Sequence, residues 1–148
     1  PTPAWDVYDG HVYKMLKIYQ TQRILAPNID IVILSAKYGL IEPTTLIEWY
    51  DQKIIESRAI ELRDSVIPAL KAKIEKEKYS EIFVHLGSDY MDAVDGFGFG
   101  YEGKLVYSKG RLGEKLQELK IWVLKQAELN GLKPSVQEDA NSLSKYFG

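Results

Sequence analysis

Hydrophobic residues recur with helical spacing in four segments of the chain. The first begins after Gly10, where apolar side chains at three- and four-residue intervals indicate a helix of about four turns. The others are Ile54–Lys78, Asp89–Phe97 and Leu112–Asn130, and Gly131 is the stop signal of the last. The pattern therefore predicts helices separated by shorter elements.

Nearly continuous apolar runs lie between these helical segments. Ile29–Ala36 is rich in β-branched residues and short, which is typical of a central strand in a parallel sheet. Ser80–Gly87 and Lys104–Ser108 are the other predicted strands. Alternating helices and strands predict an α/β fold, a three-layer sandwich with a mainly parallel sheet and helices on both faces.

Chain length and composition indicate one ordinary globular domain. The chain has 148 residues, of which 45% are hydrophobic and 27% charged. We expect a single α/β domain over residues 1–133 and a C-terminal tail or short packed end over residues 134–148. Pro68 cannot donate a hydrogen bond inside the second helix, so it predicts a kink or two abutting helices.

Several classes of protein are excluded by composition and charge. Cysteine is absent and only two histidines occur, so disulfides, thiolate nucleophiles and cysteine-based zinc sites are excluded, and no metal site is predicted. The net charge of −2 gives no global attraction to nucleic acid. No apolar run approaches the ~20 residues of a membrane span, and no signal-peptide pattern opens the chain. We expect a cytoplasmic protein without a membrane partner.

Residues that follow the predicted strands are the candidates for a site, because ligands bind parallel α/β sheets at the carboxyl ends of the strands. Ser35 and Lys37 share a face in extended geometry, and Tyr38 follows them. Gly39 would let backbone N–H groups turn toward an anion. A solvated Lys37 and a Gly39 that only completes a turn fit the same pattern, and both interpretations stay open.

The connection from Gly39 to Gln52 is longer than the ~2–6 residues usual between a strand and a helix. Such connections are typical of lids and binding segments. Tyr50 would stack on a ligand, and Asp51 would accept a hydrogen bond from it. In the alternative, Trp49 fills the core and Asp51 caps the next helix. We prefer the core position for Trp49 and the binding role for Tyr50 and Asp51.

Glycines also follow the other two strands. Gly87 comes just before a predicted helix, whose free N–H groups favour anions. Gly110, Arg111 and Gly113 lie between the third strand and the last helix, which is the best context in the chain for a phosphate cradle. The segment Gly98–Gly103 matches the dinucleotide-binding fingerprint in letters only, because it precedes a strand instead of joining a strand to a helix.

Three strings resemble a known family, together with the short string "HLGSDY": "YDGHVYK" at Tyr8–Lys14, "ILSAKYGLIEPTTLIEWYD" at Ile33–Asp51 and "GRLGEKLQELKIW" at Gly110–Trp122. The family comprises bacterial, archaeal and phage proteins of unknown function and looks like a relative of the peroxide-stress protein YaaA. Its pattern usually begins with a strand ending in a Cys-Ser and Lys motif, and no such motif precedes Tyr8.

The resemblance implies an α/β fold and a pocket. It assigns to that pocket Ser35, Lys37, Tyr38, Gly39, Tyr50, Asp51, Gly87, Tyr90 and Gly113. Because YaaA is associated with oxidative stress and DNA binding, the resemblance also suggests DNA binding and a stress response for this chain.

The first functional hypothesis is a pocket for a nucleotide, nucleobase or nucleic acid, and one form of it is an enzyme acting on a base or nucleoside. Lys37 and the Gly110–Gly113 turn would hold anionic oxygens. A base would stack on one of three side chains, Tyr38, Tyr50 or Tyr90. Asp51, if buried, would serve as a general base, so Lys37 and Asp51 are the candidate catalytic residues.

Two alternatives stay open beside this hypothesis. One is a DNA-binding stress-response protein without catalysis, which requires a contiguous basic face despite the negative net charge. The other is a partner-binding structural domain whose loop aromatics form an interface. The cofactor, the substrate and the oligomeric state are unknown from the sequence.

Overall fold

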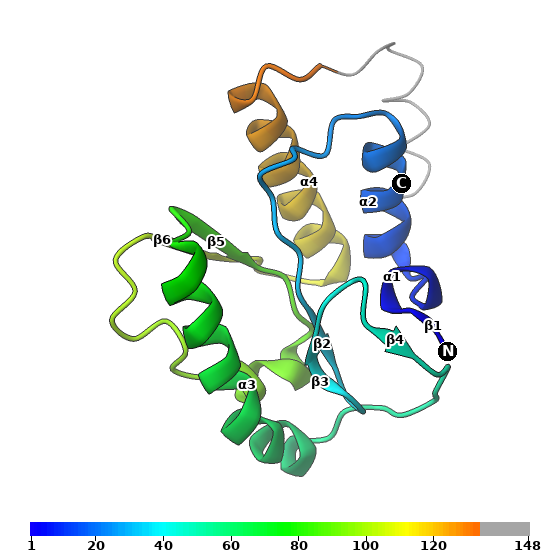
Figure 1. Ribbon diagram of the computed structural model, residues 1–148, viewed down its shortest axis with the longest axis vertical. Coiled ribbons are helices and arrows are strands. Elements are labelled where there is room, and N and C mark those ends of the chain that lie inside the picture. The colour runs from blue at the N-terminus through cyan, green and yellow to red at the C-terminus, as the bar shows by residue number, and fades with distance from the viewer. Residues whose placement is uncertain (134–148) are drawn as a thin grey trace. The chain divides into compact units, whose positions relative to one another are not determined.

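A computed structural model describes residues 1–133 of the chain. Its three long helices coincide with segments of helical periodicity (Figure 1): α2 His11–Thr21, α3 Glu56–Glu77 and α4 Leu112–Leu129. The remaining helical elements are shorter: α1 Ala4–Val7 and the 3₁₀ helix η1 Ser88–Val94.

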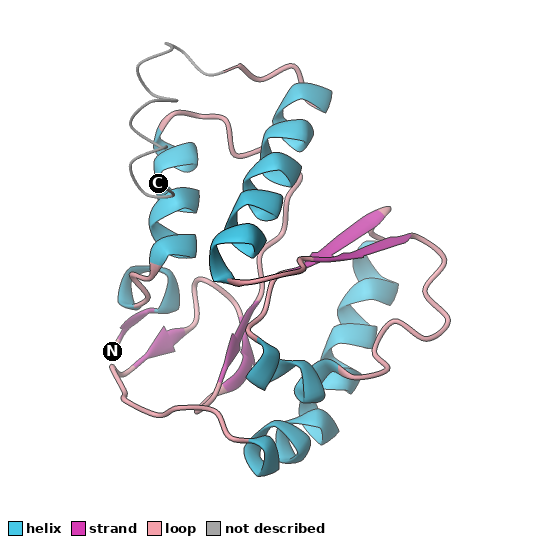
Figure 2. Ribbon diagram, turned by 180° about the vertical axis from the view of Figure 1, so that it is seen from behind, coloured by secondary structure: helices cyan, strands magenta, loops and turns pink. Residues whose placement is uncertain are grey.

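Strands in the described residues form three two-stranded sheets (Figure 2). The sheets pair β1 Thr2–Pro3 with β4 Leu46–Ile47, β2 Ile33–Ser35 with β3 Gly39–Ile41, and β5 Glu81–Val84 with β6 Lys104–Tyr107. The first two pairs are antiparallel, and only β5 and β6 run parallel. The predicted three-layer sandwich with a mainly parallel sheet is therefore wrong, although the protein is mixed α/β.

The first predicted strand does not take part in a parallel sheet. Only Ile33–Ser35 of the predicted run Ile29–Ala36 forms a strand. The chain then reverses direction, and Ile33 pairs with Ile41 while Ser35 pairs with Gly39. Gly39 has φ +76°, a left-handed conformation that glycine adopts without steric cost. A tight hairpin thus replaces the predicted central strand and long loop.

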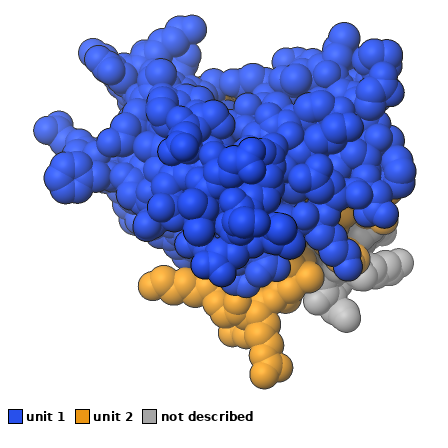
Figure 3. Space-filling model, turned by 90° about the horizontal axis from the view of Figure 1, so that it is seen from below, with its two compact units in different colours: residues 1–4, 32–107 blue, residues 5–31, 108–148 orange. Residues whose placement is uncertain are grey.

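The chain divides into two compact units (Figure 3). Unit 1 contains Pro1–Ala4 and Val32–Tyr107, whereas unit 2 contains Trp5–Ile31 and the described residues from Ser108 onward. The expected single domain over residues 1–133 stays a prediction, and the segment 134–148, expected to be a tail or packed end, lies outside the described residues.

The core of unit 1 lies around α3, which contacts η1 and β3. Arg63 of α3 donates from Nε to the carbonyl oxygen of Asp92 in η1 at 2.8 Å. The buried cluster consists of Ala36, Ile54, Ala59, Leu62, Val66, Ala93, Val94 and Phe97. The turn after β2 therefore rests on the same apolar core as α3, through Ala36.

Unit 2 contains α2 and α4, which lie side by side in both Figure 1 and Figure 2. The buried residues of α4 are those of the predicted apolar face, Leu116, Leu119, Val123 and Ala127. Leu112, which the same periodicity assigned to that face, is 65% exposed. Gly131 has φ +71° and follows the end of α4, as its role as a stop signal predicts.

Two further expectations concern the helices. A single helix, α3, runs through Pro68, so the expected pair of abutting helices is not formed. The short helix predicted at Asp89–Phe97 is present as η1, which begins one residue earlier and ends at Val94. Within residues 1–133, no helix combines the length and apolar character needed to cross a membrane.

Candidate functional site

The centre of the candidate site is the hydroxyl group of Ser35, at the end of β2. Ser35 is 1% exposed. Its Oγ accepts the backbone N–H of Lys37 at 3.2 Å and that of Tyr38 at 3.0 Å, and lies 2.8 Å from the Tyr50 hydroxyl oxygen. A serine hydroxyl has two acceptor positions and one proton. Because both acceptor positions are used by amides, Ser35 donates its proton to Tyr50.

Arg58 of α3 fixes the same turn from the other side. Its Nε donates to the Ala36 carbonyl oxygen at 2.8 Å, and its Nη2 donates to the Lys37 carbonyl oxygen at 2.9 Å. Gln52 also donates to the Ala36 carbonyl oxygen, at 3.3 Å. Nothing in the local sequence around Arg58 distinguishes it from a solvated helix residue, so the sequence analysis missed it.

Lys37 and two tyrosines form a basic aromatic surface beside this turn. The Lys37 Nζ lies 5.2 Å from the ring centroid of Tyr38 and 6.0 Å from that of Tyr50, which is cation–π range. The two rings meet edge to face, with centroids 5.6 Å apart and planes at 80°. The Tyr38 hydroxyl oxygen accepts the backbone N–H of Glu48 at 3.2 Å. Ser35, Lys37, Tyr38 and Tyr50 are hereafter called the Lys37 corner.

Tyr90 is electrostatically coupled to the Lys37 corner. Burial raises the pKa of Tyr90 above its ordinary value of 10.0, and the nearby Tyr50 and Asp89 raise it further. The Tyr90 hydroxyl therefore stays protonated at neutral pH. Gly87 lies next to it, since the Tyr90 N–H donates to the Gly87 carbonyl oxygen at 3.0 Å. The interaction with Tyr50 brings Tyr90 near the corner, whereas Gly87 is connected to the corner only through Tyr90.

Trp49 and Asp51, on either side of Tyr50, do not have the positions expected of them. Trp49 is 76% exposed, so the preferred expectation that it fills the core is wrong. Asp51 is exposed, whereas a general base was expected to be buried. Gly39 is buried in the hairpin, where a Cβ would lie 3.5 Å from Leu62, and its role is therefore to form the turn.

The predicted phosphate cradle at Gly110–Gly113 belongs to unit 2. The Lys109 N–H donates to Glu118 Oε2 at 2.8 Å, and the Arg111 N–H donates to Glu114 Oε1 at 3.1 Å. A Cβ on Gly110 would lie 2.8 Å from Glu114 Oε2. Carboxylates of the protein itself therefore occupy these two amides, which an anionic ligand would have to displace. The convergence of this turn with Lys37 stays a prediction.

Among residues 1–133, no group of three or more histidine, cysteine, aspartate or glutamate residues could hold a metal ion. The described side chains of the Lys37 corner offer hydroxyl groups, one ammonium group and aromatic rings. Such groups bind anions and planar rings.

A family model described as "Family of unknown function (DUF6884)" matches residues 1–121. The chain belongs to this family. The DUF6884 match includes the whole Lys37 corner and extends into α4. Neither a curated protein nor a solved structure matches the chain. DUF6884 membership gives no link to YaaA, so that resemblance stays a prediction.

Proposed function

We propose that this DUF6884 protein binds a nucleotide, or a related anion that carries a nucleobase, at the Lys37 corner. The observation that supports the proposal is the position of the Lys37 ammonium group beside the rings of Tyr38 and Tyr50. Stacking of a base on an aromatic side chain contributes about 1–3 kcal/mol. An ammonium group within reach of the same rings supplies the charge that a phosphate requires.

The surrounding residues have positioning roles in this proposal. Ser35 holds Tyr50 through its donated hydrogen bond, and Arg58 holds the backbone on which Lys37 stands. Tyr90, which is protonated at neutral pH, supplies a hydroxyl donor near Tyr50. Asp51 is exposed and follows Tyr50 directly, so it accepts a hydrogen bond from the bound base or sugar. A reaction on a base or nucleoside is not part of this proposal, because Asp51 is exposed and a general base at this position requires burial.

The test is a thermal-shift screen of the full chain against nucleobases, nucleosides and nucleotides. We expect nucleotides to raise the melting temperature most, since they offer both a base and a phosphate. Lys37→Ala should remove the advantage of nucleotides over nucleosides. Tyr38→Ala should weaken the effect of all ligands that carry a base, because it removes an aromatic surface.

The control variant is Lys53→Ala, which removes an exposed lysine of the same unit. It should leave every ligand shift unchanged. The proposal is overturned if no ligand stabilises the wild type. It is also overturned if Lys53→Ala and Lys37→Ala reduce the shift equally, since binding would then depend on general charge.

A further inference from the structure

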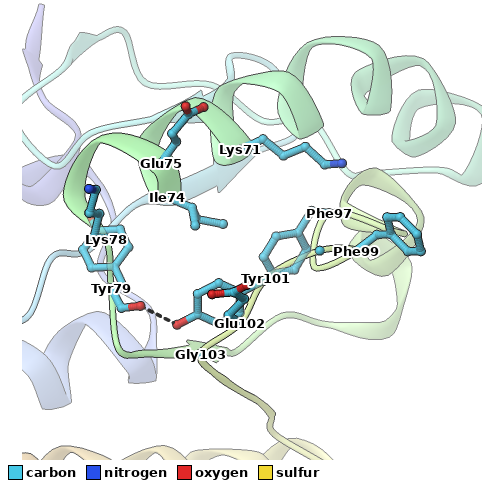
Figure 4. A pocket seen from close by; sticks show the side chains of 11 residues that line it. Lys71, Ile74, Glu75, Lys78, Tyr79, Phe97, Phe99, Tyr101, Glu102 and Gly103 are labelled. Atoms are coloured by element: carbon cyan, nitrogen blue, oxygen red, sulfur yellow. Dashed lines mark hydrogen bonds between the residues drawn. The ribbon is translucent and has the colours of Figure 1, made fainter.

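A cavity lies in unit 1, between the C-terminal half of α3 and the segment Phe97–Gly103 (Figure 4). Its volume is about 530 Å³, which is within the range of small-molecule sites. Its apolar lining comes from both walls, Ile74, Tyr79, Phe97, Phe99 and Tyr101. Phe99 is 86% exposed and lies at the mouth. We call this cavity the α3 groove.

The glycine-rich wall of the α3 groove is held in place by close packing. The Tyr101 hydroxyl donates to the Tyr79 carbonyl oxygen at 2.8 Å and thereby closes one end (Figure 4). A Cβ on Gly103 would clash with the Tyr101 hydroxyl and would lie 2.7 Å from the Ser80 carbonyl oxygen. A Cβ on Gly98 would lie 2.6 Å from Leu105 Cδ2. These glycines therefore allow the backbone of this wall to lie directly against Tyr101, Ser80 and Leu105.

The charges on the α3 wall are placed unequally around the groove. Successive helical residues are rotated by about 100°, so Lys71 lies about 60° and Glu75 about 100° from the direction of Ile74. Lys78 is the C-cap of α3, with φ +54°, and lies outside the regular helix. Figure 4 shows Ile74 pointing into the groove, Lys71 extending toward Phe99, and the Glu75 carboxylate pointing away from the rings. Within residues 1–133, neither lysine forms an ion pair. The helix wall therefore presents the Lys71 ammonium group at the Phe99 end of the groove, whereas Lys78 lies at the other end, beside Tyr79.

We propose that the α3 groove is a second binding site, for a planar aromatic ligand that carries one anionic group. The aromatic body would lie on Ile74 and the rings of the groove, and the anionic group would lie beside Lys71 at the Phe99 end. Glu102, on the opposite wall, is the one acidic side chain near the rings in Figure 4, and it opposes the anion. This site shares no residue with the Lys37 corner.

The experiment uses two fluorescent probes that differ in charge, 8-anilinonaphthalene-1-sulfonate and its neutral analogue N-phenyl-1-naphthylamine, titrated into the full chain. We expect saturable binding of the sulfonate. Lys71→Gln should raise its Kd about 2- to 5-fold, the range for one exposed charge pair. Lys78→Gln, at the other end of the groove, should raise it less. Glu102→Gln should lower the Kd of the sulfonate. None of the three should change the Kd of the neutral probe.

Two further variants separate the groove from general surface effects. Lys76→Gln is the matched control, because Lys76 lies on α3 about 200° from Ile74 and is exposed. It should leave both probes unaffected, whereas Phe99→Ala should weaken both, because it removes an aromatic contact at the mouth. The proposal is overturned if the sulfonate does not bind, or if Lys76→Gln has the effect of Lys71→Gln. Equal losses for the neutral probe would also overturn it, because the lysines would then act through the fold.

Discussion

At the scale of single residues, the candidate site depends on one small polar side chain. Ser35 is buried, and its hydroxyl makes three hydrogen bonds, with Lys37, Tyr38 and Tyr50. Buried polar groups are tolerated when they are satisfied in this way. The same bonds hold the backbone of Lys37 and the ring of Tyr50 beside it. The hydroxyl of Ser35 therefore both stabilises the turn and fixes the positions of the proposed binding groups.

Replacement of Ser35 by alanine should therefore be costly. Ser35→Ala leaves the two amides without their acceptor, and we expect a loss of about 1–3 kcal/mol in the free energy of unfolding. Tyr50→Phe removes only the hydroxyl that accepts from Ser35, and a smaller loss of about 0.5–1.5 kcal/mol is expected. Urea denaturation of both variants measures the difference. A Ser35→Ala variant as stable as the wild type would show that the amides find other acceptors.

At the scale of elements, the helices and the parallel strands β5 and β6 were predictable, whereas the sheet as a whole was not. Periodicity is a local property, and it correctly predicted where α3 and α4 lie along the chain. Strand pairing depends on which distant segment a strand meets, and the composition of the strand does not show which segment that is. Ile29–Ala36 has the apolar character of a central strand, but Ser35 and Gly39 turn the chain back into a hairpin. The sequence does contain a signal for this hairpin, because a serine and a glycine flank its turn.

The candidate site was predictable only where its residues lie close together in the sequence. Ser35, Lys37, Tyr38 and Tyr50 come together because one hairpin and the segment after it contain them all. Arg58 was missed, because its contacts with the turn are tertiary contacts made across 21 and 22 residues. Sequence reasoning thus found the residues that share a turn and missed the one that a packed helix brings to it.

The hairpin and α4 offer a paired test of glycine positions. Gly39→Ala places a Cβ on a residue with φ +76°, at ordinary contact distance from Leu62, so the expected loss of about 1–2 kcal/mol comes from the backbone. Gly113→Ala lies in the first turn of α4, where a Cβ meets nothing within 4 Å. It should stabilise the protein by up to about 1 kcal/mol.

Urea denaturation of both glycine variants under the same conditions provides the comparison. Equal effects of the two substitutions would contradict the assignment of Gly39 to the turn. A destabilising Gly113→Ala would indicate that the first turn of α4 has a constraint beyond helix propensity.

At the scale of the whole molecule, charge favours a small anionic ligand over duplex DNA. The net charge is −2. Several basic side chains of unit 1 are paired with acidic ones of the same unit, as in Arg58–Glu61 at 2.9 Å and Lys73–Glu42 at 3.0 Å. Such pairing leaves less positive charge for a phosphate backbone. The proposed nucleotide site, by contrast, uses one lysine with two tyrosines.

The salt dependence of binding separates these two partners. A protein that neutralises several phosphates of duplex DNA loses about 10³- to 10⁵-fold in affinity between about 50 and 200 mM salt. One exposed contact between Lys37 and a phosphate is only partly screened, so nucleotide affinity should fall a few-fold over the same range. Fluorescence anisotropy with a labelled nucleotide and a labelled duplex measures both, and Lys37→Ala should remove most of the salt dependence for the nucleotide. Tight duplex binding with a steep salt dependence would instead establish the DNA-binding alternative. Binding of that kind requires a basic face, which the Lys37 corner alone does not supply.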